Sequence, residues 1–320
     1  MKNIKKIRWA LDPFSSESAP IEHSVRLLEQ LFGAGGIEVT PTYILGSDLT
    51  QWISYFNPQI TPDTIGQVKE AMTQKIAAFQ PTFKLSTPEI IDSKGFSTRS
   101  DAQTLVDAMG SHDLLLIHTR ATKGISALFL GSFAESVLNR LNKPILFTSP
   151  EMSVHSPQVE KICYPTSLSL ESLEVFKKFV DETHFAGKQF LIYSKVLHPA
   201  SSLLSETSTL LGGAPIDLEP FLKENNEKIE MEKKKWTEFL ESKGIHFSIH
   251  IDQGTQDVAE GIVDFSKSQS CDLIVMPSFA TKMDTLLVGS HAKNTIRMSP
   301  IPVISWHHEV KETPTTTLYS

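Results

Sequence analysis

The sequence is poor in cysteine and has no long apolar run. Only Cys163 and Cys271 occur among 320 residues. Both lie in or beside predicted buried strands, so we expect reduced core thiols rather than a disulfide. No segment approaches the roughly 18 apolar residues that a membrane span needs, and the N-terminus passes into a strand without the apolar run of a signal peptide. We therefore expect a cytoplasmic protein without a membrane partner.

The sequence also lacks a surplus of basic residues. Its 30 Lys and Arg are outnumbered by 37 Asp and Glu, which gives a net charge of -7. No basic stripe is available to neutralise phosphates in series, so a nucleic-acid partner is not expected. The one dense lysine cluster, at 233–235, alternates with glutamates at helical spacing and predicts a solvated helix face.

Motifs of hydrolytic and metal chemistry are missing. The sequence has no HExxH, CxxC, GxSxG or GxxxxGK[ST] spacing. His246 and His250 fall on a predicted strand, where four rises of roughly 3.3 Å hold them about 13 Å apart, too far to share a metal. The adjacent His307 and His308 fall on a predicted mobile end. Nothing assembles a nucleophile, a base and an orienting group, so binding is favoured over catalysis, with no metal site.

What the sequence does contain is a repeat. One stretch occurs as DLLLIHTRATKGISALFLGS from Asp113 and again as DLIVMPSFATKMDTLLVGS from Asp272. The two aspartates align at an offset of 159 residues, and after one deletion the Gly-Ser steps at 131–132 and 289–290 align at an offset of 158. Two copies of one fold therefore fill the chain.

Each copy alternates apolar strands with amphipathic helices, which predicts α/β folding around a mostly parallel sheet. We expect two tandem, doubly wound, five-stranded parallel-sheet sandwiches, in domains 1–150 and 156–308, with a mobile tail at 309–320. The strands are predicted at 7–11, 37–45, 89–92, 114–118, 145–148, 161–166, 190–195, 245–251, 273–276 and 303–306. The helices are predicted at 20–32, 62–78, 100–109, 133–141, 170–182, 218–242, 256–268 and 291–298.

These residues resemble the universal stress protein family in its tandem form. The opening strand ending at Asp12, the segment DLLLIHTR and the segment LGSFAESVLNRLNKPILF are similar to that family's first strand, fourth strand and last loop, helix and strand. The resemblance implies an adenine nucleotide alpha hydrolase-like fold and a non-catalytic role as a stress-response regulator or binding protein. It also implies that strands 145–148 and 303–306 pair antiparallel, as an intrachain pseudo-dimer.

The nucleotide-binding branch of the family carries a loop of the form GxxG, nine residues, then Gly-Ser or Gly-Thr. Glycines let the backbone pass close to ribose and phosphate, and the Gly-Ser step offers donors at a helix N-terminus. The spacing is met here, but His118 and Ala121 occupy both glycine positions and only Gly131 and Ser132 remain. The resemblance implies ATP with Mg²⁺ as the ligand of the first half, near Asp12 and these four residues.

The second half departs further from the family pattern. Pro277 and Ala280 stand where the glycines would be, and Ser167 stands at the position that matches Asp12. The second site is therefore expected to be degenerate.

Several alternatives stay open at the level of residues. Asp12 either contacts a nucleotide or its metal, or caps the next turn. The Gly131-Ser132 step either binds phosphate or starts a helix through a capping box with Glu135. His118 gates, blocks or fills the site. The loop cations Arg120, Lys123 and Lys282 either face a phosphate or are solvated.

Three functions follow from these alternatives. The first is a regulator that binds a nucleotide in the first half. The second is a nucleotide-independent scaffold or signalling protein that meets a protein partner through the helix at 218–242 or the aromatic loop at 52–56. The third is a weak nucleotide hydrolase with a metal held by Asp12. A homodimer is a further alternative that stays open under each function.

Overall fold

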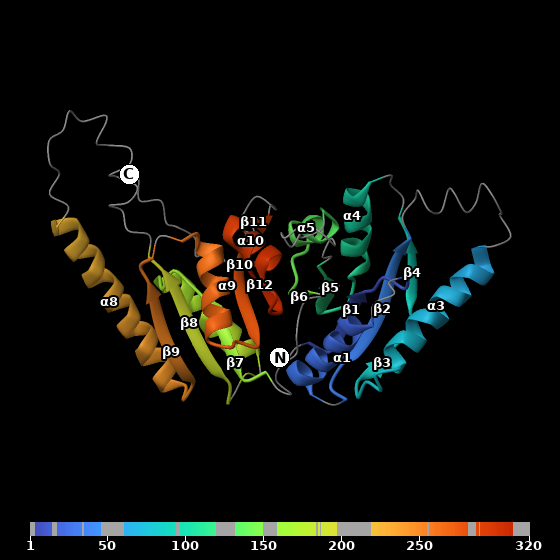
Figure 1. Cartoon of the computed structure of the whole chain (residues 1–320), viewed down its shortest axis with the longest axis horizontal. Helices are drawn as coiled ribbons and strands as arrows, with labels where there is room; N and C mark the ends of the chain where they lie inside the picture. Colours follow the sequence, from blue (N-terminus) through green and yellow to red (C-terminus); the bar gives the residue numbers. More distant parts are fainter. Residues whose placement is uncertain are drawn as a thin grey trace, which may run out of the picture. The chain divides into compact units, whose positions relative to one another are not determined.

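A computed structural model gives the fold of the chain (Figure 1). It describes residues 4–14, 18–33, 35–45, 61–93, 97–119, 132–149, 159–183, 185, 187–196, 219–254, 256–280, 286–287 and 289–309. By their contacts the residues form two compact units. The larger unit combines Asn3–Pro157 with Met276–Ser320, and the smaller combines Gln158–Val275 with Met1–Lys2. The domain limits expected at 150 and 156 stay a prediction.

The strands of the larger unit follow the order β3-β2-β1-β5-β6-β12. All the pairs among β1, β2, β3, β5 and β6 are parallel, and β4 also pairs parallel with β2. The last strand, β12, runs antiparallel to β6, with Ile304 opposite Leu146. The strands are β1 (Lys6–Ala10), β2 (Glu38–Leu45), β3 (Lys84–Leu85), β4 (Glu89–Asp92), β5 (Leu114–His118), β6 (Ile145–Thr148) and β12 (Val303–Glu309).

Helices cover both faces of this sheet. The connections from β1 to β2 and from β2 to β4 run in one direction along the sheet, and those from β4 to β5 and from β5 to β6 run back. Right-handed crossovers then place α1 and α3 on one face and α4 and α5 on the other, in agreement with the contacts of α1 with α3 and of α4 with α5. The helices are α1 (Ala19–Phe32), α3 (Thr61–Ala77), α4 (Thr98–Ala108), α5 (Ser132–Leu138) and α10 (Ser290–Met298).

Apolar spacing explains how α1 packs. Ile21, Val25 and Leu28 recur at four and three residues, the spacing of one helix face, and all three are buried. The helix begins with a proline in its first turn, where no intrahelical N–H bond is lost. It ends at Gly33, whose φ of 75° suits glycine.

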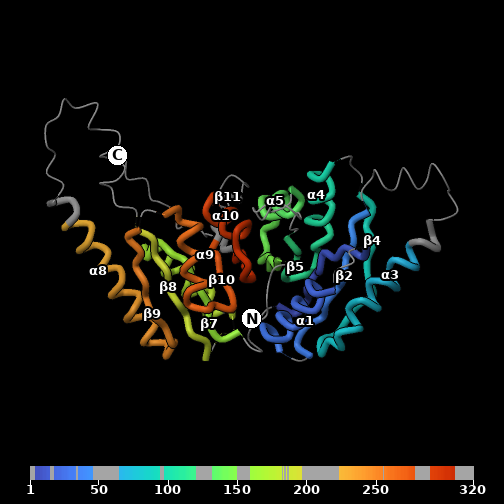
Figure 2. The backbone as a smooth tube through the Cα atoms, viewed as in Figure 1, coloured from blue at the N-terminus to red at the C-terminus, as the bar shows by residue number. Residues whose placement is uncertain are grey.

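The smaller unit has the strand order β10-β7-β8-β9, with parallel pairing throughout. Its core is aromatic, since the Phe176 ring lies 4.7 Å from Tyr164, 5.2 Å from Trp236 and 5.4 Å from Phe190 between centroids. The backbone trace in Figure 2 shows the alternation of strand and helix. The elements are β7 (Lys161–Pro165), α6 (Leu170–Glu182), β8 (Gln189–Lys195), α8 (Glu219–Ser242), β9 (His246–Asp252), α9 (Val258–Ser268) and β10 (Leu273–Ala280), of which 273–275 lie in this unit.

The α/β class with mostly parallel strands is confirmed, but two strands continue well beyond their predicted ends. β10 does not stop at residue 276; it continues to Ala280 because Phe279 pairs with Leu287 of β11 (Leu286–Leu287) in an antiparallel hairpin. β12 continues to Glu309, so the expectation of an irregular end at His307 and His308 is wrong. None of the described helices is both long and apolar enough to cross a bilayer.

Candidate functional site

The candidate site lies at the carboxyl ends of β1 and β5 in the larger unit. These strands are parallel neighbours, with Trp9 opposite Leu116. The chain leaves β1 toward α1 on one face and leaves β5 toward α5 on the other face. Such a reversal of strand order opens a crevice beyond the carboxyl ends of the strands, where α/β proteins bind ligands.

Asp12 stands two residues after the end of β1 and is held in a turn. Its Oδ1 accepts the backbone N–H of Phe14 at 3.0 Å, which is an Asx-turn. The turn is tied to α3, because Lys75 donates to the carbonyl of Pro13. The Phe14 ring makes an edge contact with Tyr43 at 5.6 Å and is otherwise exposed. The turn fixes the carboxylate of Asp12 at the carboxyl end of β1.

His118, at the end of β5, turns its ring into the layer between the sheet and α1. The indole Nε1 of Trp9 donates to Nε2 at 3.2 Å, and Thr148 Oγ1 lies 2.7 Å from Nδ1. Because Nε2 accepts, this network assigns the proton to Nδ1, which donates to Thr148. Burial lowers the pKa of His118 to about 4. The imidazole is therefore neutral and fills a place among β1, β5 and β6.

The remaining predicted site residues are only partly described. Ser132 is exposed and begins α5, and the nearby Glu135 carboxylate lies 3.7 Å from Lys293 Nζ. Ala121 and Gly131 lie outside the described residues, as do the loop cations at 120, 123 and 282. Of the five predicted residues, the structure brings Asp12 and His118 to the same sheet edge.

The equivalent edge in the smaller unit is filled. Leu168, which follows Ser167, is 1 % exposed and has a left-handed φ of 61°. Its carbonyl accepts the indole N–H of Trp236 at 2.8 Å. Ser167 Oγ lies 2.8 Å from Ser172 Oγ. The position of Asp12 is taken here by Ser167, whose hydroxyl is hydrogen-bonded to that of Ser172. The next residue is the buried Leu168.

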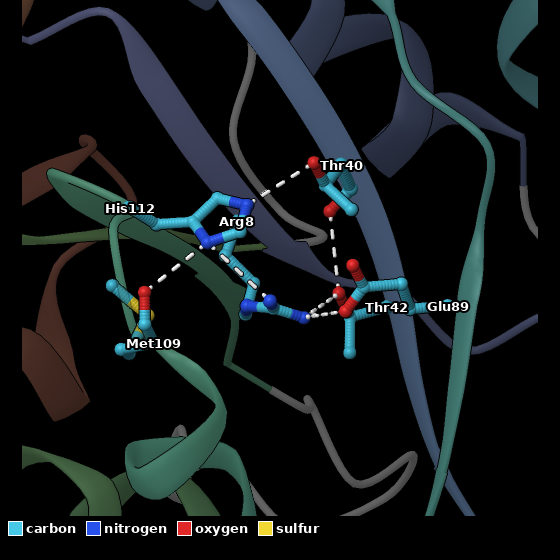
Figure 3. Close-up of polar contacts among 6 residues, drawn as sticks. All are labelled: Arg8, Thr40, Thr42, Glu89, Met109 and His112. Atoms are coloured by element: carbon cyan, nitrogen blue, oxygen red, sulfur yellow. Dashed lines mark hydrogen bonds and ion pairs between the residues drawn. The ribbon is translucent and has the colours of Figure 1, made fainter.

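A charged cluster around the buried Arg8 in the larger unit was not anticipated from the sequence (Figure 3). Arg8, on β1, is 3 % exposed and donates to Thr42 Oγ1 and to the Glu89 carboxylate, both at 2.7 Å. His112 Nδ1 lies 3.3 Å from the guanidinium, and His112 Nε2 lies 3.1 Å from Thr40 Oγ1. Burial and the neighbouring Arg8 lower the pKa of His112. The cluster joins β1, β2 and β4 to His112, which lies two residues before β5.

The repeat shows that the fold does not require these charges. Arg8 is the third residue of β1, and Cys163 is the third residue of β7. In the same way, Thr42 matches Tyr193 by strand register, and His112 matches Cys271, since each precedes the repeated aspartate. Burial raises the pKa of the Cys163 thiol, which is hydrogen-bonded to the free thiol of Cys271. One fold thus holds a charged cluster in one copy and thiols with a tyrosine in the other.

A second unanticipated cluster ends β8 and β9. Asp252 Oδ2 accepts from Lys195 Nζ at 2.8 Å and from Tyr193 Oη at 2.6 Å, while Oδ1 accepts the N–H of Gly254 at 2.7 Å. Burial opposes ionisation of Asp252, but these hydrogen bonds outweigh it and lower its pKa to about 2. The sequence does show a charged residue at the end of each strand, Lys195 and Asp252, but only the strand register brings the two together. Within the described ranges, no three His, Cys, Asp or Glu side chains are grouped to hold a metal ion.

Comparison with known proteins defines the class. Residues 158–305 match the model of the Universal stress protein family. The fold resembles a universal stress protein from Archaeoglobus fulgidus, with 17 % identity, a TM-score of 0.55 and coverage of 94 % of this chain and 98 % of that one. It also resembles a putative universal stress protein from Pseudomonas aeruginosa, with 11 % identity, a TM-score of 0.59 and coverage of 96 % and 94 %. No curated protein sequence matches.

At these identities the structural likeness shows the fold, and it extends over both halves of the chain. The second half, residues 158–305, matches the family model, and the whole chain has the tandem fold of universal stress proteins.

Proposed function

We propose that this chain is a cytoplasmic, non-catalytic binding protein of the stress response, which takes up ATP with Mg²⁺ in its first half only. The observation that carries the proposal is the place of Asp12. Its carboxylate is held at the carboxyl end of β1, where β1 and β5 lead to helices on opposite faces of the sheet.

The state of His118 supports a site that is not blocked by its side chain. The ring is bonded to Trp9 and Thr148, so it is held within the layer of the sheet. Mg²⁺ commonly binds through one or two carboxylates together with the phosphates of its nucleotide, and the single carboxylate of Asp12 fits that role. In the second half, the matching Ser167 is a hydroxyl bonded to Ser172, which supports a single site per chain.

Thermal unfolding with and without millimolar ATP and Mg²⁺ tests the proposal. A ligand at about 100 times its dissociation constant stabilises the folded state by roughly 2.7 kcal/mol, which raises the midpoint measurably. We expect the rise in wild type and its loss in the double variant Gly131→Val with Ser132→Ala. The matched control is Ser167→Ala, which alters the second half and should keep the rise. An unchanged midpoint in wild type would overturn the proposal in favour of a nucleotide-independent scaffold.

A further inference from the structure

The two copies of the fold end in edge strands of very different character. In the larger unit the edge beside β2 is broken into β3 and β4. Val39 pairs with Leu85 and Thr42 pairs with Glu89. An advance of three residues along β2 therefore lies opposite an advance of four residues along the edge strand. An extra residue of this kind is a bulge, and Pro88 lies within it. Bulges, prolines and charges are the devices that stop sheet edges from pairing with other chains.

The edge of the smaller unit has neither a bulge nor a proline within its strand. β9, with the sequence HFSIHID, pairs with β8 in seven consecutive positions, from Gln189 with His246 to Lys195 with Asp252. It contains no proline, lysine or bulge, and among the described residues it pairs only with β8. A regular edge of this length presents a row of unpaired backbone donors and acceptors.

We propose that β9 pairs antiparallel with β9 of a second copy of this chain, around a twofold axis at Ile249. This inference is independent of the nucleotide proposal. An isologous contact requires a surface that is complementary to itself. The sequence of β9 is complementary to itself in this register. Ile249 faces its own copy, Phe247 faces Ile251, Ser248 faces His250, and His246 faces Asp252.

The apolar face of β9 fits this register. Phe247, Ile249 and Ile251 are half-buried on one face of the strand, whereas His246, Ser248 and His250 are exposed on the other. Pairing would place Phe247 against Ile251 and Ile249 against its own copy across the axis. Aromatic with β-branched pairs and β-branched with β-branched pairs are cross-strand pairs that stabilise a sheet. A slip by one residue would place apolar against polar side chains.

The polar side chains at the two ends of β9 also match. A carboxylate has about four acceptor positions, and Asp252 uses three of them, for Lys195, Tyr193 and Gly254. The remaining position is on Oδ1, and an imidazole N–H of His246 from the second copy supplies a donor. The twofold axis makes this contact twice.

Sedimentation equilibrium tests the pairing over a range from micromolar to hundreds of micromolar protein. We expect a mass that approaches twice 35.6 kDa in wild type. Ser248→Lys places a lysine opposite His250 of the second copy and should return the mass to that of one chain. The matched control is Asn226→Lys, which adds the same charge on an exposed position of α8 and should leave the dimer intact.

Cysteine substitution tests the register. Ile249→Cys would face itself across the axis, so mild oxidation should link two chains, whereas Ser248→Cys faces His250 and should link poorly. The native Cys163 and Cys271 are buried and serve as the internal background. A wild-type mass of 35.6 kDa at every concentration would overturn the proposal. So would a dimer that survives Ser248→Lys, or equal linking at positions 248 and 249.

Discussion

At the scale of single residues, His118 carries the clearest pH dependence. Its pKa is lowered to about 4 by burial, against about 6.5 in an unfolded chain. The unfolded state therefore binds the proton first as pH falls, and folding stability is lost between pH 6.5 and pH 4. The loss is at most about 3 kcal/mol. We expect His118→Phe to remove this slope from the unfolding midpoint measured against pH, while equal slopes in both proteins would contradict the assignment.

Gly261, within α9, is required by a close approach. A Cβ atom at this position would lie 2.3 Å from the Tyr193 hydroxyl, nearer than two atoms can pack. Ala favours a helix over Gly by about 1 kcal/mol, but overpacking costs about 1–3 kcal/mol. We expect Gly261→Ala to lower the free energy of unfolding in urea. Gly66→Ala is the matched control, because it lies in α3 with no heavy atom within 4 Å of its Cβ, and it should raise that free energy.

At the scale of elements, the repeated aspartates have the same structural role. Asp113 accepts the backbone N–H groups of Lys5 and Lys6, each at 2.9 Å. Asp272 accepts those of Glu160 and Lys161 at 2.8 and 2.9 Å. Each carboxylate ties the start of the first strand of its copy, β1 or β7, to the start of β5 or β10, which explains why this part of the repeat has an aspartate.

We expect Asp113→Ala and Asp272→Ala each to cost about 1–2 kcal/mol, because each leaves two N–H groups without their charged acceptor. Urea unfolding checks both values. Asp107→Ala, in the exposed part of α4, is the comparison and should stay within about 0.5 kcal/mol of wild type. If all three variants unfolded alike, the aspartates would not have this structural role.

The elements differ in how far the sequence predicts them. Helices such as α1 and α9 follow from apolar spacing, and strands such as β5 from short apolar runs. The hairpin of β10 with β11, in which Phe279 pairs with Leu287, did not follow, because residues 281–285 contain no Gly, Pro or Asn to signal a turn. The contacts of Arg8 with Glu89 and of Lys195 with Asp252 did not follow either. They depend on strand register, which a single sequence does not state.

At the scale of the whole molecule, one fold has been kept twice while its sites have diverged. The aspartate after the first strand remains in the first copy as Asp12, and the second copy has Ser167 followed by the buried Leu168. We therefore predict one nucleotide per chain, although the fold provides two equivalent positions at the carboxyl ends of its strands.

Isothermal titration of the full chain with ATP and Mg²⁺ tests this claim most directly, because it counts sites. We expect a stoichiometry near one per chain, with the heat lost in Asp12→Ala and kept in Ser167→Ala. A stoichiometry near two, no binding heat in wild type, or binding that survives Asp12→Ala would contradict it.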